Sequence, residues 1–386
     1  MNRKKILGTG FIIVILILSA LSIITMASLS APRAQNENKV SYYYLMRQMI
    51  WLIIGWLGFL VTANLKYKKY REITKYLYVI GAFSLVMVLV IGTTKNGAKR
   101  WIDLGMGMRI QPSEFVKLIL IVVLSTLVYN LKIRNKISKH PWLSSIVIMG
   151  TTGVYMFLIL FEKSFSNTVQ IAIIGMTYLL VSELKLSIIA LYMGLGGILG
   201  WFGVMKVGYR ASRIAEHTSK EIGFQTTQSL IAISNGKIFG KFYGNGFQKY
   251  GFLPEIHTDY IFSGYAEENG FIGALFLLGL YISLLVIIAI TLRKIKNVYA
   301  KYILVGIFIM FATQVIGNVA VVSNVIPSTG IPLPMMSYGG STTIVMMSTL
   351  GIVYNIIRAL YKQEMGENLD EMNEIDYELI NQRKRR

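Results

Sequence analysis

One polar stretch, residues 253–270, gathers five ionisable side chains that could do chemistry in this strongly apolar chain. It contains Glu255, His257, Asp259, Glu267 and Glu268, whereas other acidic residues are scarce outside the C-terminal end. A charge beside a membrane span must be solvated, paired or used, because burying it alone costs several kcal/mol. A carboxylate in this position can take a proton from an attacking hydroxyl, and Asp259 is the candidate for such a base.

Each of these side chains also has a structural alternative. Asp259 could cap the N-terminus of the following helix, and Glu267 and Glu268 could be first-turn residues favoured by the helix dipole. His257 could be an ordinary hydrogen-bonded loop histidine rather than an acid or a base. The spacing of the residues leaves both interpretations open.

Two further segments offer complementary chemistry. Residues 92–114 are basic and include Gln111 and Glu114, and arginine and lysine side chains there suit a diphosphate. The alternatives are an interfacial role for Arg100 and a helix-start ion pair between Glu114 and Lys117. Residues 323–341 hold three prolines, which exclude a regular helix. Broken backbone at a membrane edge is tolerated where protein buries it or where it lines a cavity.

The composition excludes several classes of site. The 386 residues include no cysteine and only three histidines, which excludes disulfides, cysteine-ligated zinc and cysteine nucleophiles and argues against a histidine-based metal site. No Walker-type phosphate loop is present. The net charge of +20 would indicate nucleic acid in a soluble protein, but here we assign it to loops beside an anionic leaflet and expect no nucleic-acid partner.

Apolar runs long enough to cross a bilayer recur along almost the whole chain, which predicts an all-α polytopic membrane protein. Basic residues concentrate in alternate loops, so we expect both termini in the cytoplasm and a long extracellular loop, 208–270, between spans seven and eight. We expect one transmembrane domain, 1–361, and a charged cytoplasmic tail, 362–386. The ten predicted spans are 6–26, 46–63, 76–91, 115–129, 142–160, 168–184, 186–207, 271–292, 302–322 and 342–361.

The predicted outward loops also carry basic residues, which run against this bias and call for an anionic ligand. They are Lys95, Lys99, Arg100, Arg109, Arg210, Arg213, Lys220, Lys237, Lys241 and Lys249.

At these residues the sequence resembles the SEDS family (shape, elongation, division and sporulation), which includes FtsW, RodA and SpoVE. The resemblance rests on GAKRWIDLG with QPSEFVK, on QKYGFLPEIHTDYIFSGYAEENGFIG and on GIPLPMMSYGGS, and it covers nearly the whole chain. The segments YYYLMRQMIW and FQTTQSLIAI are more similar to the FtsW and SpoVE branch than to RodA.

The resemblance implies a peptidoglycan glycosyltransferase of the bacterial cytoplasmic membrane that polymerises lipid II at the outer face. It implies that Asp259 is the general base on the acceptor sugar's hydroxyl, which displaces undecaprenyl pyrophosphate from the donor. It also implies a class B penicillin-binding protein as partner, together with other division or elongation proteins and membrane lipids. The substrate-binding positions that it suggests are Arg100, Gln111, Glu114, Lys117, Lys249, Glu255, His257 and Ser337.

One segment departs from the family pattern. After the fifth span the family commonly has a QPDLGT-like sequence, whereas this chain has EKSFSNT over residues 162–168, so no role of the family's acid transfers. Two other functions stay open, a lipid II flippase and a non-catalytic scaffold for a transpeptidase. Charges gathered at the outer edge favour catalysis over transport, because transporters bind near the midplane. A divalent cation, Mg²⁺ or Mn²⁺, is compatible with a pyrophosphate leaving group, but we assign no metal-binding residue.

Overall fold

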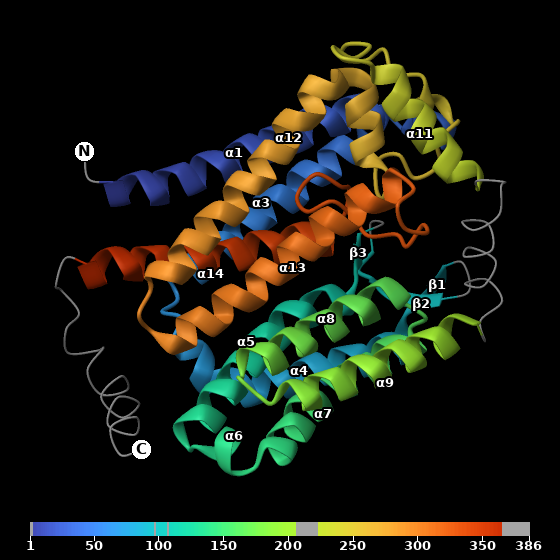
Figure 1. Cartoon of the computed structure of the whole chain (residues 1–386). Helices are drawn as coiled ribbons and strands as arrows, with labels where there is room; N and C mark the ends of the chain where they lie inside the picture. The colour runs from blue at the N-terminus through green and yellow to red at the C-terminus, as the bar shows by residue number, and fades with distance from the viewer. Residues whose placement is uncertain (1–2, 96–97, 106–107, 206–222, 365–386) are drawn as a thin grey trace.

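The computed structural model describes residues 3–95, 98–105, 108–205 and 223–364, and these are mostly helical (Figure 1). The elements are α1 (Arg3–Leu29), α2 (Ala31–Asn36), α3 (Tyr43–Asn64), α4 (Lys69–Ile91), β1 (Thr93–Lys95), β2 (Ala98–Asp103), β3 (Arg109–Ile110), α5 (Pro112–Ile133), α6 (Lys136–Lys139), α7 (Pro141–Phe161), α8 (Phe165–Val181), α9 (Leu186–Met205), α11 (Phe224–Gly236), the 3-10 helix η1 (Gln248–Tyr250), α12 (Ile261–Lys294), α13 (Val298–Val322) and α14 (Gly340–Glu364).

The long helices make this chain a multi-pass membrane protein, as predicted. Within the described residues, eight helices are long and apolar enough to cross a bilayer, namely α1, α3, α4, α5, α7, α12, α13 and α14. Helix α8 and the Leu186–Ile198 part of α9 are apolar but shorter. Each predicted span overlaps a helix, although residues 182–184 of the sixth lie outside α8 and residues 206–207 of the seventh lie outside the described residues. The exact number of crossings stays a prediction.

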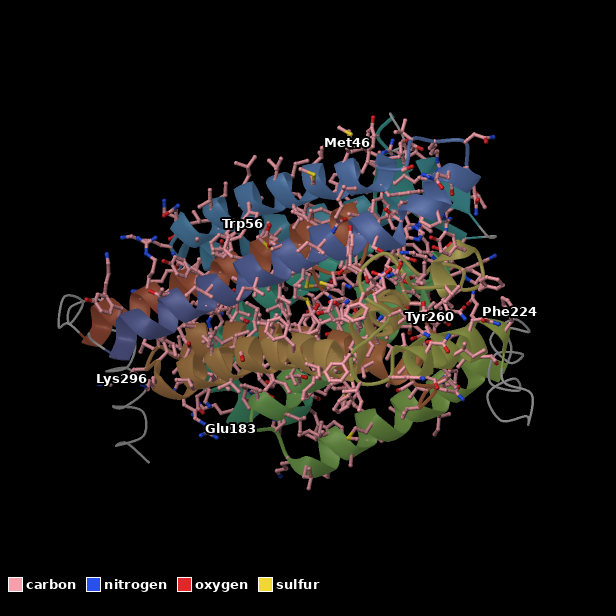
Figure 2. The ribbon with its side chains drawn as sticks, turned by 90° about the horizontal axis from the view of Figure 1, so that it is seen from above. Met46, Trp56, Glu183, Phe224, Tyr260 and Lys296 are labelled. Carbon is pink, nitrogen blue, oxygen red and sulfur yellow. The ribbon has the colours of Figure 1, made fainter. Side chains whose placement is uncertain are left out.

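The helices run between two ends of the molecule. Helix α1 begins and α14 ends at one end, and the three strands and α11 lie at the other (Figure 1). Figure 2 places Lys296 and Glu183 toward the first end and Phe224 and Tyr260 toward the second. Predicted cytoplasmic and predicted outward segments are therefore separated in space.

The centre of the bundle is formed by α5, α13 and α14, in which 61%, 61% and 67% of the apolar span is buried. Helices α3, α4 and α7 turn large apolar side chains outward, such as Leu57, Phe83 and Phe157. Helix α14 packs closely on α3. A Cβ added at Gly351 would lie only 2.1 Å from the Oγ1 atom of Thr62, so there is no room for a side chain there. Small residues at such crossings let membrane helices approach each other.

A small antiparallel sheet connects α4 to α5, in the order β1-β2-β3, and the all-α prediction missed it. Thr93 lies opposite Trp101, and Asp103 opposite Arg109. Backbone groups in a short connection outside regular helices must find partners, and here they pair with each other.

The predicted outward loop is partly helical and ends in a kinked helix. Residues 206–222 lie outside the described residues, and the remainder forms α11, η1 and the start of α12. Helix α12 begins ten residues before the predicted eighth span, and its helical geometry breaks at Gly270, where φ is 67° and ψ −168°. A Cβ at Gly270 would lie 2.3 Å from the backbone nitrogen of Gly240, so only glycine fits. The kink therefore holds the loop against the helix.

Candidate functional site

Asp259 lies in the turn that enters α12, and its side chain is half-buried. Its backbone carbonyl accepts a hydrogen bond of 2.7 Å from the Nδ2 atom of Asn318, a fully buried residue of α13. The same amide donates to the carbonyl of Ile331 at 2.8 Å. The residue at the N-cap of α12 is Tyr260, with no side-chain capping bond, so the capping alternative for Asp259 is wrong. Asn318 joins two outward segments.

The proline-rich segment, residues 323–341, follows the backbone of this turn. The hydroxyl of Ser337 donates to the carbonyl of Thr258 at 2.6 Å, and the backbone N–H of Tyr338 donates to the carbonyl of His257 at 2.9 Å. Gly330 has a φ of 69°, and a Cβ there would lie 3.2 Å from the Oδ2 atom of Asp259. The segment therefore packs against the candidate base.

Glu255 and His257 support the turn in different ways. The carboxylate of Glu255 accepts from the Thr258 hydroxyl at 2.9 Å and lies 3.4 Å from an Nη1 atom of Arg33. His257 is buried, and its ring centroid lies 5.1 Å from that of Tyr44. These contacts anchor the turn to residues 33–44.

The basic segment meets the turn between α7 and α8. The Nε atom of Arg100, on β2, donates to the carbonyl of Glu162 at 3.2 Å, and its Nη2 atom donates to that of Lys163. The backbone N–H of Gln111 donates to the hydroxyl of Ser341 at 2.7 Å. The hydroxyl of Ser166, in the first turn of α8, donates a hydrogen bond to the carbonyl of Thr329 in the proline-rich segment. Together with the bonds of Ser337 and Tyr338, these contacts link the three outward segments.

Glu114 and Lys117 form the predicted ion pair, 2.8 Å apart and almost fully buried in the first turns of α5. The Nζ atom of Lys117 also donates to Gln170 at 2.8 Å and to Asn167 at 3.4 Å. A buried ammonium requires such partners, because desolvation otherwise disfavours its charge. Asn167 and Gln170 are polar groups on α8 that the sequence analysis did not single out.

Glu162 is a further acid that the site prediction missed. It follows α7 directly and is fully buried, and neither of its carboxylate oxygens has a hydrogen-bond partner. Burial raises the pKa of Glu162 to about 8, and the Glu114 carboxylate adds to the rise, whereas the Ser113 hydroxyl and Arg100 oppose it. The available signal was an acid where the family commonly has glutamine.

Lys249 is buried in an ion pair, whereas the sequence analysis expected it to contact the substrate. Its Nζ atom lies 2.7 Å from the carboxylate of Glu268, and it donates to the hydroxyl of Ser28 at 2.8 Å and to the carbonyl of Gly244 at 2.6 Å. Glu267 accepts from two backbone N–H groups at 3.1 Å. Both acids lie beyond the first turn of α12, so the helix-dipole alternative for them is wrong.

No group of three or more histidine, aspartate or glutamate side chains that could hold a metal ion occurs within the described part of the chain. A divalent cation bound entirely by carboxylate and histidine side chains therefore has no site among these residues, whereas Mg²⁺ usually takes one or two carboxylates together with substrate phosphates.

Comparison with known proteins identifies the family. A family model described as a cell cycle protein, covering FtsW, RodA and SpoVE, matches residues 9–362. The probable peptidoglycan glycosyltransferase FtsW of Coxiella burnetii is 31% identical over 379 residues, which cover 94% of this chain and 100% of the relative. Stage V sporulation protein E of Bacillus subtilis is 33% identical over 356 residues, which cover 90% and 96%.

A similar fold occurs in a solved peptidoglycan synthase complex that coordinates polymerization and crosslinking. One of its chains aligns with a TM-score of 0.73 and 25% identity, over 92% of this chain and 98% of that one. The chain therefore belongs to the FtsW/RodA/SpoVE family of cell cycle proteins.

Proposed function

We propose that this protein is a peptidoglycan glycosyltransferase that polymerises lipid II, with Asp259 as its general base. The names of two relatives support the reaction type, since both are described as a probable peptidoglycan glycosyltransferase FtsW. The observation that carries the assignment to Asp259 is its position. Its half-buried carboxylate lies where the acidic turn and the proline-rich segment meet, with Gly330 against it.

In this reaction the acceptor sugar's hydroxyl attacks the anomeric carbon of the donor, and the bond to undecaprenyl pyrophosphate breaks with its electron pair. Asp259 takes the hydroxyl proton. General-base catalysis of this kind contributes about 10²–10⁴-fold to the rate. The leaving diphosphate requires cations, and Arg100 is our candidate because it lies on the outward sheet. The buried ion pair of Lys117 and Glu114 lies in the first turns of α5, the helix that follows this sheet.

The proposal assigns different roles to the remaining predicted residues. Gln111, Glu255, His257 and Ser337 hold the backbone of the site through the contacts described above, and we assign them positioning roles. Lys249 stabilises the outward loop through Glu268. We also propose that both termini are cytoplasmic, with 1–361 as the membrane domain and 362–386 as a charged tail.

A class B penicillin-binding protein is the proposed partner, because a structural relative belongs to a complex that coordinates polymerization with crosslinking. Such a transpeptidase would join the glycan strands that this protein makes. Other division or elongation proteins are expected in the same assembly.

The test is polymerisation of lipid II by the full chain reconstituted with its transpeptidase. Wild type should yield glycan strands and Asp259→Asn should yield none, with an unchanged thermal unfolding midpoint. Asp103→Asn is the matched control, since Asp103 is an outward carboxylate on β2 that contacts Arg109 at 3.4 Å, and it should remain active. Equal rates for wild type and Asp259→Asn would refute the assignment. Lipid II translocation without strand synthesis would favour the flippase.

A further inference from the structure

Glu162 is fully buried, and no hydrogen bond of normal geometry reaches its carboxylate oxygens, although the Ser113 hydroxyl lies close enough to favour the charged form. Buried polar groups in folded proteins are nearly always paired, and an isolated buried carboxylate is the least favourable exception. A neutral carboxylic acid avoids most of this penalty, since it carries one O–H donor and no net charge. The environment of Glu162 therefore selects the protonated form.

The neighbours of Glu162 belong to the candidate site. Its own backbone carbonyl holds Arg100 of β2, and the α5 residues Ser113 and Glu114 act on its side chain together with Arg100. Lys117, one turn further along α5, is the ion-pair partner of Glu114. Among the described residues, the charged groups that face Glu162 are thus Arg100 from the sheet and Glu114 from α5, with Lys117 next to Glu114.

We propose that Glu162 works as a neutral carboxylic acid and is a positioning residue for the glycosyl transfer. Its proton keeps Glu114 paired with Lys117 and leaves Arg100 on the backbone carbonyls of the α7–α8 turn. Loss of one proton to solvent would create a second carboxylate beside Glu114. That charge would compete for Lys117 and draw the Arg100 guanidinium away from its carbonyl partners. This inference rests on the proposed function.

The direction of the titration follows from burial. The pKa of Glu162 is raised to about 8, from an ordinary value of 4.5, so the group is neutral at pH 7 and ionises on the alkaline side. One pH unit above that value, about a tenth of the molecules would still carry the proton. We therefore expect the wild-type rate to fall about tenfold near pH 9, relative to a variant that cannot ionise.

The experiment compares pH profiles of lipid II polymerisation by the full chain with its transpeptidase. Glu162→Gln keeps a neutral side chain of the same shape, so its rate at neutral pH should match wild type and its alkaline fall should be absent. Glu183→Gln is the control, because Glu183 is an exposed carboxylate on the α8–α9 turn that pairs with Lys132 of α5. This control should keep the wild-type profile. The fall should appear in kcat rather than in KM for lipid II.

Two results would overturn the inference. One is an alkaline fall in Glu162→Gln equal to that of wild type. The other is an inactive Glu162→Gln protein with an unchanged unfolding midpoint, which would mean that a carboxylate is required. If the variant fails to fold, infrared spectra of wild type decide the matter: a protonated-carboxyl band that disappears near pH 8 supports the inference, and its absence at pH 7 refutes it. Inactive wild type would instead refute the proposed function.

Discussion

Replacement of Lys249 by methionine is expected to destabilise the protein rather than to weaken substrate binding. Lys249 and Glu268 are each 3% exposed, and the Nζ atom makes three contacts of 2.6–2.8 Å. In Lys249→Met, the carboxylate of Glu268 stays buried with the Ser28 hydroxyl, at 2.5 Å, as its remaining side-chain donor. Breaking a buried pair in this way costs about 3–5 kcal/mol.

The assay is thermal unfolding in a fixed detergent at one scan rate, combined with polymerisation measured well below the unfolding midpoint. Lys249→Met should lower the midpoint clearly, and the double variant Lys249→Met with Glu268→Gln should recover most of the loss, because no uncompensated charge remains. Lys241→Met is the control on the same loop and should leave the midpoint unchanged. A Lys249→Met protein of normal stability that no longer uses lipid II would refute the reasoning and restore the expected substrate contact.

Three further predictions concern the site. Ser337→Ala removes the hydroxyl that bonds the carbonyl of Thr258, which should cost about 1–3 kcal/mol of stability and lower kcat; unfolding and rate measurements check this. Gly330→Ala adds a Cβ 3.2 Å from Asp259 at a positive φ, so we expect about 1–2 kcal/mol of destabilisation and a slower reaction than in Gly279→Ala, where the space is open. For Glu162, whose folded pKa is raised from 4.5 to about 8, stability is greatest below pH 4.5 and falls as pH rises to 8. At about 1.4 kcal/mol per pH unit this loss is on the order of 5 kcal/mol, and the midpoint of Glu162→Gln should fall less than that of wild type between pH 5 and 9.

Hydropathy and short spacings predicted the parts of this structure that depend on local sequence. Each of the ten predicted spans overlaps a helix, because a bilayer-length apolar run has few alternatives to a helix. The ion pair of Glu114 and Lys117 could also be predicted from local sequence, since residues three apart share a helix face.

Contacts between segments that are distant in the sequence could not be predicted in this way. Lys249 meets Glu268 only because the loop folds back on the first turns of α12, residues that the sequence analysis placed in the loop before the predicted span at 271. Asn318 was overlooked as one polar residue in an apolar span, yet it binds two segments at once. Its importance depends on which loops lie against α13, and that is a property of the fold.

The backbone around Asp259 is held by hydrogen bonds from other elements. Three successive carbonyls, those of residues 257, 258 and 259, each accept a hydrogen bond from another element, and the donors are Tyr338, Ser337 and Asn318. A carboxylate on a backbone held in this way is pre-organised, because the backbone that carries it is fixed by hydrogen bonds that the reaction does not break. It follows that Asp259→Asn changes the chemistry while the turn keeps its shape, whereas Asn318→Ala should shift the turn and lower the rate with the carboxylate intact. Comparison of these two variants separates the role of the acid from that of its support.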